Sequence, residues 1–246
     1  MSDFDRNIAA RGSYGAERAA VDVGLRAYMI RVYNYMASGV ALTGVVAWLT
    51  FGAAVENGKL TSFGQTLFSG PTTIILFLAT LGIVFFMSFR IDRLQPSTAL
   101  MLFMGYAALL GLMLSSVFLV YTGSSITRTF FISAASFGAL SLYGYTTQRD
   151  LSPIGSFLIM GVIGLCLAML VNYFLKSTGL DFIISAVGVL VFAGLTAWDT
   201  QRIKEMYSVQ DDGTIAGRKA VMGALQLYLD FINLFLFLLR FLGDRR

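Results

Sequence analysis

Two aspartates, Asp199 and Asp230, lie inside the last two apolar runs of the chain, where the surrounding solvent would be hydrocarbon. An ionised side chain at the centre of a bilayer costs about 2.5 to 3.5 kcal/mol on insertion scales, so each aspartate needs a partner, a proton or a water-filled cavity. Two carboxylates that share a site of low dielectric cannot both ionise cheaply, and they titrate as a coupled unit. Because the chain has no histidine, we expect its response to pH near neutrality to come from these carboxyl groups.

Carboxylate oxygens are also ligands for Ca²⁺, which commonly takes 6 to 8 oxygens, so two aspartates fall far short of a tight cage. Weak and transient coordination suits a leak or a channel, where an ion must also leave. We therefore predict that Asp199 and Asp230 sense protons and coordinate Ca²⁺ transiently along its path. In this interpretation Ca²⁺ is the transported ion, and the protein has no cofactor.

Two amides accompany Asp230 on the final apolar run. Gln226 lies four residues before it and Asn233 three residues after it, which places all three on one stripe of a helix. A polar stripe on an otherwise apolar helix should face the interior of a bundle or an aqueous path. The alternative is a buried hydrogen-bond network between helices that has no role in transport.

Arg90 closes the second apolar run and is a candidate latch. A guanidinium can hold a carboxylate in a bidentate fork until a proton neutralises the acid, and Asp199 lies at a matching depth. The simpler role of Arg90 is to orient the protein in the membrane. Asp199 also has a simpler interpretation, because it lies one turn from Arg202 and beside Trp198, where an interfacial ion pair would suffice.

Motifs for several enzyme classes are absent from the sequence. The chain has no glycine-rich loop for nucleoside triphosphates, no His-Glu-x-x-His zinc helix and no Gly-x-Ser-x-Gly motif in a strand-turn-helix setting. Two membrane aspartates can activate water in a protease, but neither Asp199 nor Asp230 lies in a signature for that activity. Cys166 is the only cysteine, which excludes a disulfide framework and a cysteine metal cluster. We predict that the protein is not an enzyme.

Composition indicates an all-α membrane protein. The chain is 57% apolar and 13% charged, with a mean hydropathy of +0.73. Its net charge of +4 does not indicate binding to nucleic acid, because the basic residues are spread between apolar segments. Seven apolar runs, each near the ~20 residues that cross a bilayer, predict seven helices. The runs are 32–53, 71–89, 97–121, 129–147, 153–175, 182–201 and 219–241.

The distribution of basic residues predicts the topology. Residues 1–28 are polar and form a predicted N-terminal segment, and 29–246 form a single transmembrane domain. Counted in alternate connections, twelve Lys and Arg lie on the N-terminal side and three on the other side before the tail, which places the N-terminus in the cytoplasm. Three arginines at the C-terminus conflict with seven crossings. The last helix is therefore expected to be a half-span or to lie in a protein-lined cavity.

Two segments resemble signature regions of the Bax inhibitor-1 family. They are 193–203 (AGLTAWDTQRI) and 227–235 (LYLDFINLF), which contain Asp199 and Asp230. The seven apolar runs and the short N-terminal region are also similar to that family, so the resemblance covers nearly the whole chain. The bacterial YccA-like branch is the closer match, which implies a location in the bacterial inner membrane.

The resemblance implies a fold and a function. The family fold is a seven-helix bundle whose last helix is surrounded by the other six. Members are described as pH-sensitive Ca²⁺ leak channels with an acid pair on the last two helices, which matches Asp199 and Asp230, and with an arginine on the second helix, which matches Arg90 by order. Some bacterial relatives resemble inhibitors of the membrane protease FtsH. The alternative function is therefore a non-conducting modulator that binds such a protease through residues 1–28 or the connection 202–218.

Overall fold

The computed structural model describes the backbone from Asp3 to Arg246 and the side chains from Asp22 onward. It is an all-α structure with one short hairpin. The elements in chain order are α1 (Asp3–Ala54), β1 (Val55–Glu56), β2 (Lys59–Leu60), α2 (Ser62–Leu67), α3 (Gly70–Arg90), the 3₁₀ turn η1 (Ile91–Arg93), α4 (Pro96–Leu114), α5 (Val117–Val120), α6 (Gly123–Thr146), α7 (Ser152–Leu175), α8 (Thr178–Glu205) and α9 (Gly213–Leu242).

Local sequence explains where these elements begin and turn. All three prolines stand in the first turn of a helix, where the missing N–H costs nothing. β1 and β2 are joined by Asn57 and Gly58, both with positive φ, as a two-residue hairpin requires. α9 begins after Asp212, whose carboxylate accepts a hydrogen bond from the N–H of Ile215 at 2.7 Å. These are the breaks that the apolar runs predict.

The part of the chain with described side chains contains six helices that are long and apolar enough to cross a membrane. The predicted count of seven is therefore met only in part. The helix left out is α6, which has the length but carries Arg128 and many hydroxyl side chains. Its hydroxyls point inward, because Ser125, Thr129, Ser133 and Ser141 are all buried. A helix that buries its polar face and exposes phenylalanines is the reverse of a helix on a soluble protein.

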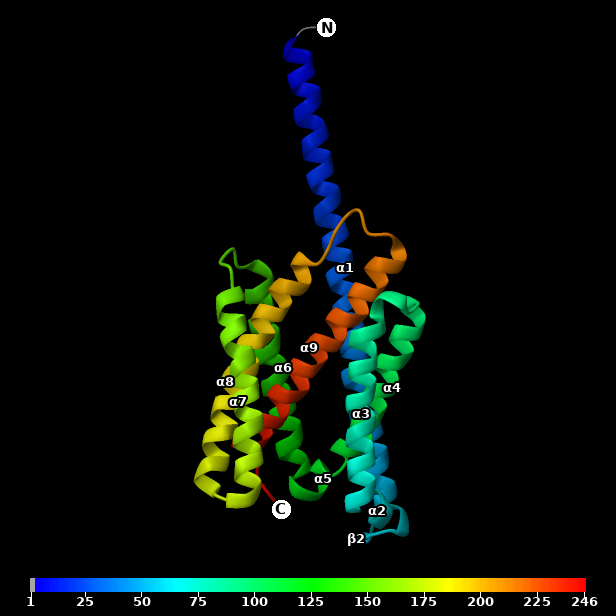
Figure 1. Ribbon diagram of the computed structural model, residues 1–246, viewed down its shortest axis with the longest axis vertical. Coiled ribbons are helices and arrows are strands. Elements are labelled where there is room, and N and C mark those ends of the chain that lie inside the picture. The colour runs from blue at the N-terminus through cyan, green and yellow to red at the C-terminus, as the bar shows by residue number, and fades with distance from the viewer. Residues whose placement is uncertain (1–2) are drawn as a thin grey trace.

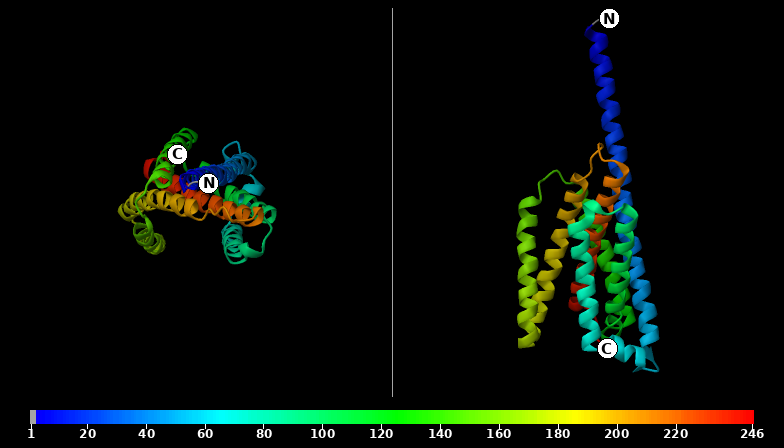
Figure 2. Two further views of the ribbon diagram at one scale, coloured as in Figure 1. Left: turned by 90° about the horizontal axis from the view of Figure 1, so that it is seen from above. Right: turned by 45° about the vertical axis from the view of Figure 1, so that its right-hand side comes forward.

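Helix α9 lies at the centre of the bundle. It is the most buried of the six candidate spans and packs against α8, α1, α6 and α4, whereas α3 packs on α4 and α7 packs on α8. It runs obliquely from the end where α8 finishes to the opposite end (Figure 1). Seen from above, α1 and α6 lie on one side of the α8–α9 layer, and α3 and α7 lie on the other (Figure 2). α9 has 30 residues, about 45 Å of helix, which is longer than a half-span.

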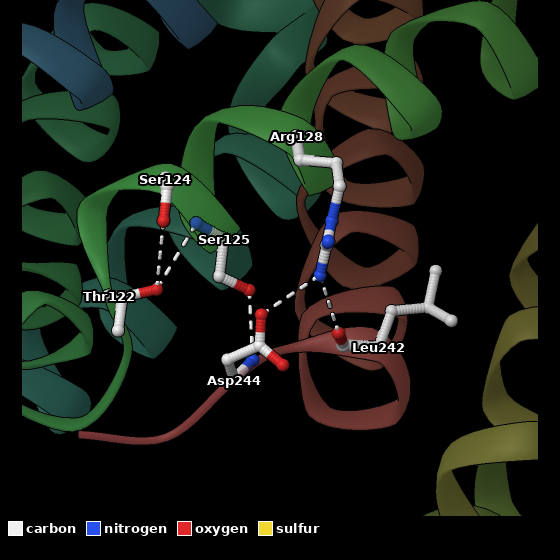
Figure 3. Close-up of polar contacts among 6 residues, drawn as sticks. All are labelled: Thr122, Ser124, Ser125, Arg128, Leu242 and Asp244. Carbon is white, nitrogen blue, oxygen red and sulfur yellow. Dashed lines mark hydrogen bonds and ion pairs between the residues drawn. The ribbon is translucent and has the colours of Figure 1, made fainter.

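The C-terminal tail is bound to the first turns of α6. Asp244 pairs with Arg128 at 3.1 Å, and its N–H donates to the hydroxyl of Ser125 at 2.9 Å (Figure 3). Arg240 and Arg245 lie 3.5 and 3.7 Å from the carboxylate of Asp181 at the start of α8. Two of the three arginines that conflicted with seven crossings therefore have an acidic partner at this end of the bundle.

The connection between α8 and α9 is shorter than the sequence indicated. α8 continues to Glu205 and α9 begins at Gly213, so most of the expected connection 202–218 is helical. Basic side chains in 202–218 donate hydrogen bonds to backbone carbonyls at the ends of neighbouring helices. Lys204 Nζ donates to the carbonyl of Tyr145 at 2.8 Å, and Arg218 Nε donates to that of Leu94 at 2.7 Å. Cations at exposed carbonyls of helix ends are favourable contacts.

Glycine makes the approach of α6 to α8 possible. A Cβ at Gly144 would collide with the backbone carbonyl of Ala197, whereas a Cβ at Gly138 on the same helix would meet nothing within 4 Å. Other helical glycines differ in the same way, because Gly111 lies against α1, whereas a Cβ at Gly164 would meet nothing within 4 Å. Close packing therefore depends on particular glycines.

We expect Gly144→Ala to destabilise the protein by about 1–3 kcal/mol, because the backbone of α8 must shift to admit the methyl group. Gly138→Ala is the matched control and should be neutral or slightly stabilising, since alanine is the better helix former. Thermal unfolding of both purified variants in detergent measures the difference. Equal melting temperatures would contradict this packing.

Candidate functional site

Asp199 and Asp230 meet at the contact between α8 and α9. Each side chain is only 4% exposed, and the two carboxyl groups are within hydrogen-bonding reach of each other. A hydrogen bond between two carboxyl groups requires that at least one of them carries a proton. The structure therefore brings together the two residues that the sequence singled out, in a geometry that suits a shared proton.

One oxygen atom of this pair lacks a partner. Oδ2 of Asp230 is buried and accepts no hydrogen bond from the described part of the chain. Oδ1 of Asp199 accepts from the amide of Gln226 at 3.0 Å. A buried acceptor without a donor is costly, so this oxygen is a position where a proton, a water molecule or a cation would be favourable.

Two glycines on neighbouring helices allow those helices to pack closely against α8 in the turn before Asp199. Gly144 of α6 faces the backbone of Ala197, and Gly155 of α7 faces the indole of Trp198. On the other side, Gly223 of α9 packs against Ile203 of α8. α8 is thus held by three helices around Asp199, and its carboxyl group is fixed toward α9.

The helix that carries Asp230 is anchored by a hydroxyl network that the sequence interpretation missed. Tyr228 is fully buried, and its hydroxyl lies 2.6 Å from that of Thr43 on α1, which also donates to the carbonyl of Ala107 on α4 at 2.9 Å. Rings from α4 surround Tyr228, with Phe103 and Tyr106 both packed edge-on against it. The signal in the sequence was a tyrosine two residues before the aspartate, within the apolar run.

A second hydroxyl chain joins α1, α6 and α8. Tyr33 and Ser141 lie 2.5 Å apart, and Ser141 lies 2.9 Å from Thr200, which also bonds the carbonyl of Thr196. Thr196 and Thr200 are spaced four residues apart, and so are Thr129, Ser133, Phe137 and Ser141 along α6. This spacing is the signal that would have identified the polar inner faces of α6 and α8.

Arg90 does not reach the aspartate pair. It is exposed at the end of α3, and α3 packs on α4 rather than on α8. No ion pair joins Arg90 to an acidic side chain among the residues whose side chains are described. Equal depth in the membrane did not predict lateral contact. The guanidinium closest along the chain to Asp199 belongs to Arg202, which lies 5.5 Å from the centre of the Trp198 ring.

The polar stripe on α9 divides in two. Gln226 contacts the pair, as expected, but Asn233 donates to the carbonyl of Leu229 on its own helix at 2.8 Å. Asn233 also lines a cavity of about 290 Å³ together with Tyr121 and Arg240 near the C-terminal end of α9. Asn233 is therefore separate from the carboxyl contact.

The donor set is small for a metal ion. Among the residues whose side chains are described, no group of three or more His, Cys, Asp or Glu could hold a metal ion. Two carboxyl groups remain, which fits brief coordination of a hard cation better than a permanent site. Most of the segment 1–28, the predicted docking region for a protease, lies outside the residues whose side chains are described.

Comparison with known proteins supports the family resemblance. The family model described as "Inhibitor of apoptosis-promoting Bax1" matches residues 25–246. The chain is 52% identical over 246 residues to the uncharacterized protein RP147 of Rickettsia prowazekii, with both chains fully covered. It is 47% identical over 226 residues to the inner membrane protein YbhL of Escherichia coli K12, which covers 91% of this chain and 94% of YbhL. The chain is a multi-pass membrane protein that belongs to the Bax inhibitor family.

Proposed function

We propose that this protein is a pH-sensitive Ca²⁺ leak channel of the bacterial inner membrane, controlled by protonation of the Asp199–Asp230 pair. The observation that carries the proposal is the contact of two buried carboxyl groups between the central helix α9 and α8. Buried acids in membrane helices mark ion and proton pathways more often than they stabilise a fold. The inner-membrane location is supported by the name of the relative YbhL.

Competition between protons and cations supplies the pH dependence. A proton shared by the two carboxyl groups occupies the position where a cation would bind, so the pair holds one or the other. Loss of the proton leaves adjacent negative charges that repel each other and attract Ca²⁺. Return of a proton releases the cation and restores the contact between α8 and α9. This mechanism does not need Arg90 as a latch.

The proposed topology has seven crossings. α6 has 24 residues, about 36 Å of helix, and runs alongside α8 and α9 with its apolar residues outward. Adding it to the six candidate spans gives a bundle with its two chain ends on opposite sides of the membrane. The excess of basic residues on the side of the N-terminus supports a cytoplasmic N-terminus.

Removal of one carboxyl group tests the channel. Asp230→Asn keeps the shape of the side chain but cannot titrate, so we expect Ca²⁺ flux into dye-loaded liposomes to be lost or to become independent of pH between about pH 6 and 8. Asp244→Asn makes the same chemical change at the exposed tail and should leave the pH response intact. Normal pH-dependent flux through Asp230→Asn, or no flux through correctly inserted wild type, would refute the proposal.

Gln226 provides a second prediction, because it donates the amide hydrogen bond to Asp199. Gln226→Leu leaves a buried acceptor unpaired and should destabilise the protein by about 1–3 kcal/mol. Asn233→Leu is the control on the same stripe. It removes the side-chain amide that donates to the carbonyl of Leu229, but this carbonyl can keep its backbone hydrogen bond within the helix. Unfolding in denaturing detergent gives both values, and an equal loss in the two variants would argue against a special role for Gln226.

A further inference from the structure

A groove runs along the outside of the bundle between α1 and α6. The two helices lie on the same side of α9 (Figure 2), and the hydroxyls of Tyr33 on α1 and Ser141 on α6 bond to each other. Its first part is a cavity of about 530 Å³, lined on α1 by residues between Arg26 and Tyr33 and on α6 by residues between Phe137 and Tyr145. Its walls are mainly apolar, and Ile30 and Leu142 at its edge are 49% and 63% exposed. The groove is therefore open toward the surrounding membrane.

A second cavity continues the groove toward the middle of the bundle. It measures about 290 Å³ and is lined by Met36 to Ala41 of α1, by residues of α6 that include Phe137, and by Phe231 of α9. Phe137 lines both cavities, so they adjoin, and together they are called the groove. From Arg26 to Ala41 the groove follows sixteen residues of α1, an axial rise of about 22 Å. One leaflet of a bilayer, with its headgroups, has about the same thickness.

The two ends of the groove differ in charge. Arg26 lies at the outer end, and Lys204 Nζ lies 5.7 Å from the centre of the Tyr145 ring that lines the same end. Toward the middle the lining carries no charge, and the hydroxyls of Tyr33 and Ser141 bond to each other. A positive end joined to an apolar channel one leaflet long complements a molecule with an anionic head and a hydrocarbon tail.

The charge at one end favours a lipid over a helix as the occupant. Arg26 is the only charged residue in the lining of the two cavities, and a single cation at the end of an apolar groove matches one anionic headgroup. The larger cavity between α3 and α4, about 770 Å³, has no charged residue in its lining and offers no site for a headgroup.

We propose that the α1–α6 groove binds an anionic phospholipid of the leaflet on the N-terminal side, with its phosphate at Arg26 and one acyl chain along Tyr33, Phe137 and Ala37. The inference does not depend on ion conduction. It assigns a ligand site to a face of the protein that the aspartate pair does not use.

Glycine positions make the acyl channel testable. Gly138 lines the groove, and a Cβ there would meet no protein atom within 4 Å, so Gly138→Leu fills the channel without a clash at its Cβ. Gly105 on α4 has the same open surroundings and lies outside every cavity described above, so Gly105→Leu is the matched control. Arg26→Gln removes the charge at the headgroup end. Arg31→Gln removes an equal charge from an exposed position on the same helix that does not line the groove.

Native mass spectrometry of the full chain in detergent, with phosphatidylglycerol or phosphatidylcholine of identical chains, measures the binding. We expect wild type to favour phosphatidylglycerol by about tenfold, as a charge-assisted hydrogen bond implies. Arg26→Gln should abolish the preference and Arg31→Gln should retain it. Gly138→Leu should lose both lipids at this site, and Gly105→Leu should keep them. Glycerol phosphate, which has no acyl chain, should not compete.

Three results would overturn the proposal. The first is an equal preference in Arg26→Gln and Arg31→Gln, and the second is unchanged lipid binding in Gly138→Leu. The third is a change of the protein from dimer to monomer in Gly138→Leu without loss of lipid, which would assign the groove to a second copy of the chain. Calcium flux measured on the same variants tests the channel proposal separately. Loss of lipid binding would leave the flux proposal standing, and loss of flux would leave the lipid proposal standing.

Discussion

The contact between two carboxyl groups in the interior of a membrane bundle constrains the rest of this structure. Asp199 and Asp230 cannot face lipid, and they cannot both be charged at contact distance without a counterion. The helices that carry them must therefore be the inner ones, and α9 is the most buried of the candidate spans. In the proposed function, a proton or a cation between them would therefore stabilise the fold as well as control it.

The neighbouring helices meet this constraint by turning their polar residues inward. α6 buries a row of serines and threonines, α1 contributes Thr43 and Tyr33, and α9 contributes Tyr228. Each of these hydroxyls except that of Thr129 has a side-chain or backbone partner within the described part of the chain. The outer surface is phenylalanine, leucine and isoleucine, which would be an aggregation risk in water and is the appropriate surface in lipid.

The sequence predicted the centre of the site better than its surroundings. A charged residue within an apolar run is a strong local signal, so Asp199, Asp230 and the flanking Gln226 were found directly. Arg90 was placed by its depth and by its order along the chain, and neither determines which helices are neighbours. α6 was expected as a span from its apolar residues, but its serines and arginine lower the hydropathy below that of the other six helices. The approach of α6 to α8 depends on the missing Cβ of Gly144, which no periodicity reveals.

The central helix follows all of its partner helices in the chain. Chains leave the ribosome from the N-terminus, so α1 to α8 are complete before α9 emerges. Until then α8 presents Asp199 without Asp230, and α1 presents Thr43 without Tyr228, to the lipid or water at the centre of the incomplete bundle. The core of this protein can therefore close only after α9 has been made, and so can the hydrogen bonds that join Asp244 and Arg246 to Thr122 and Val120.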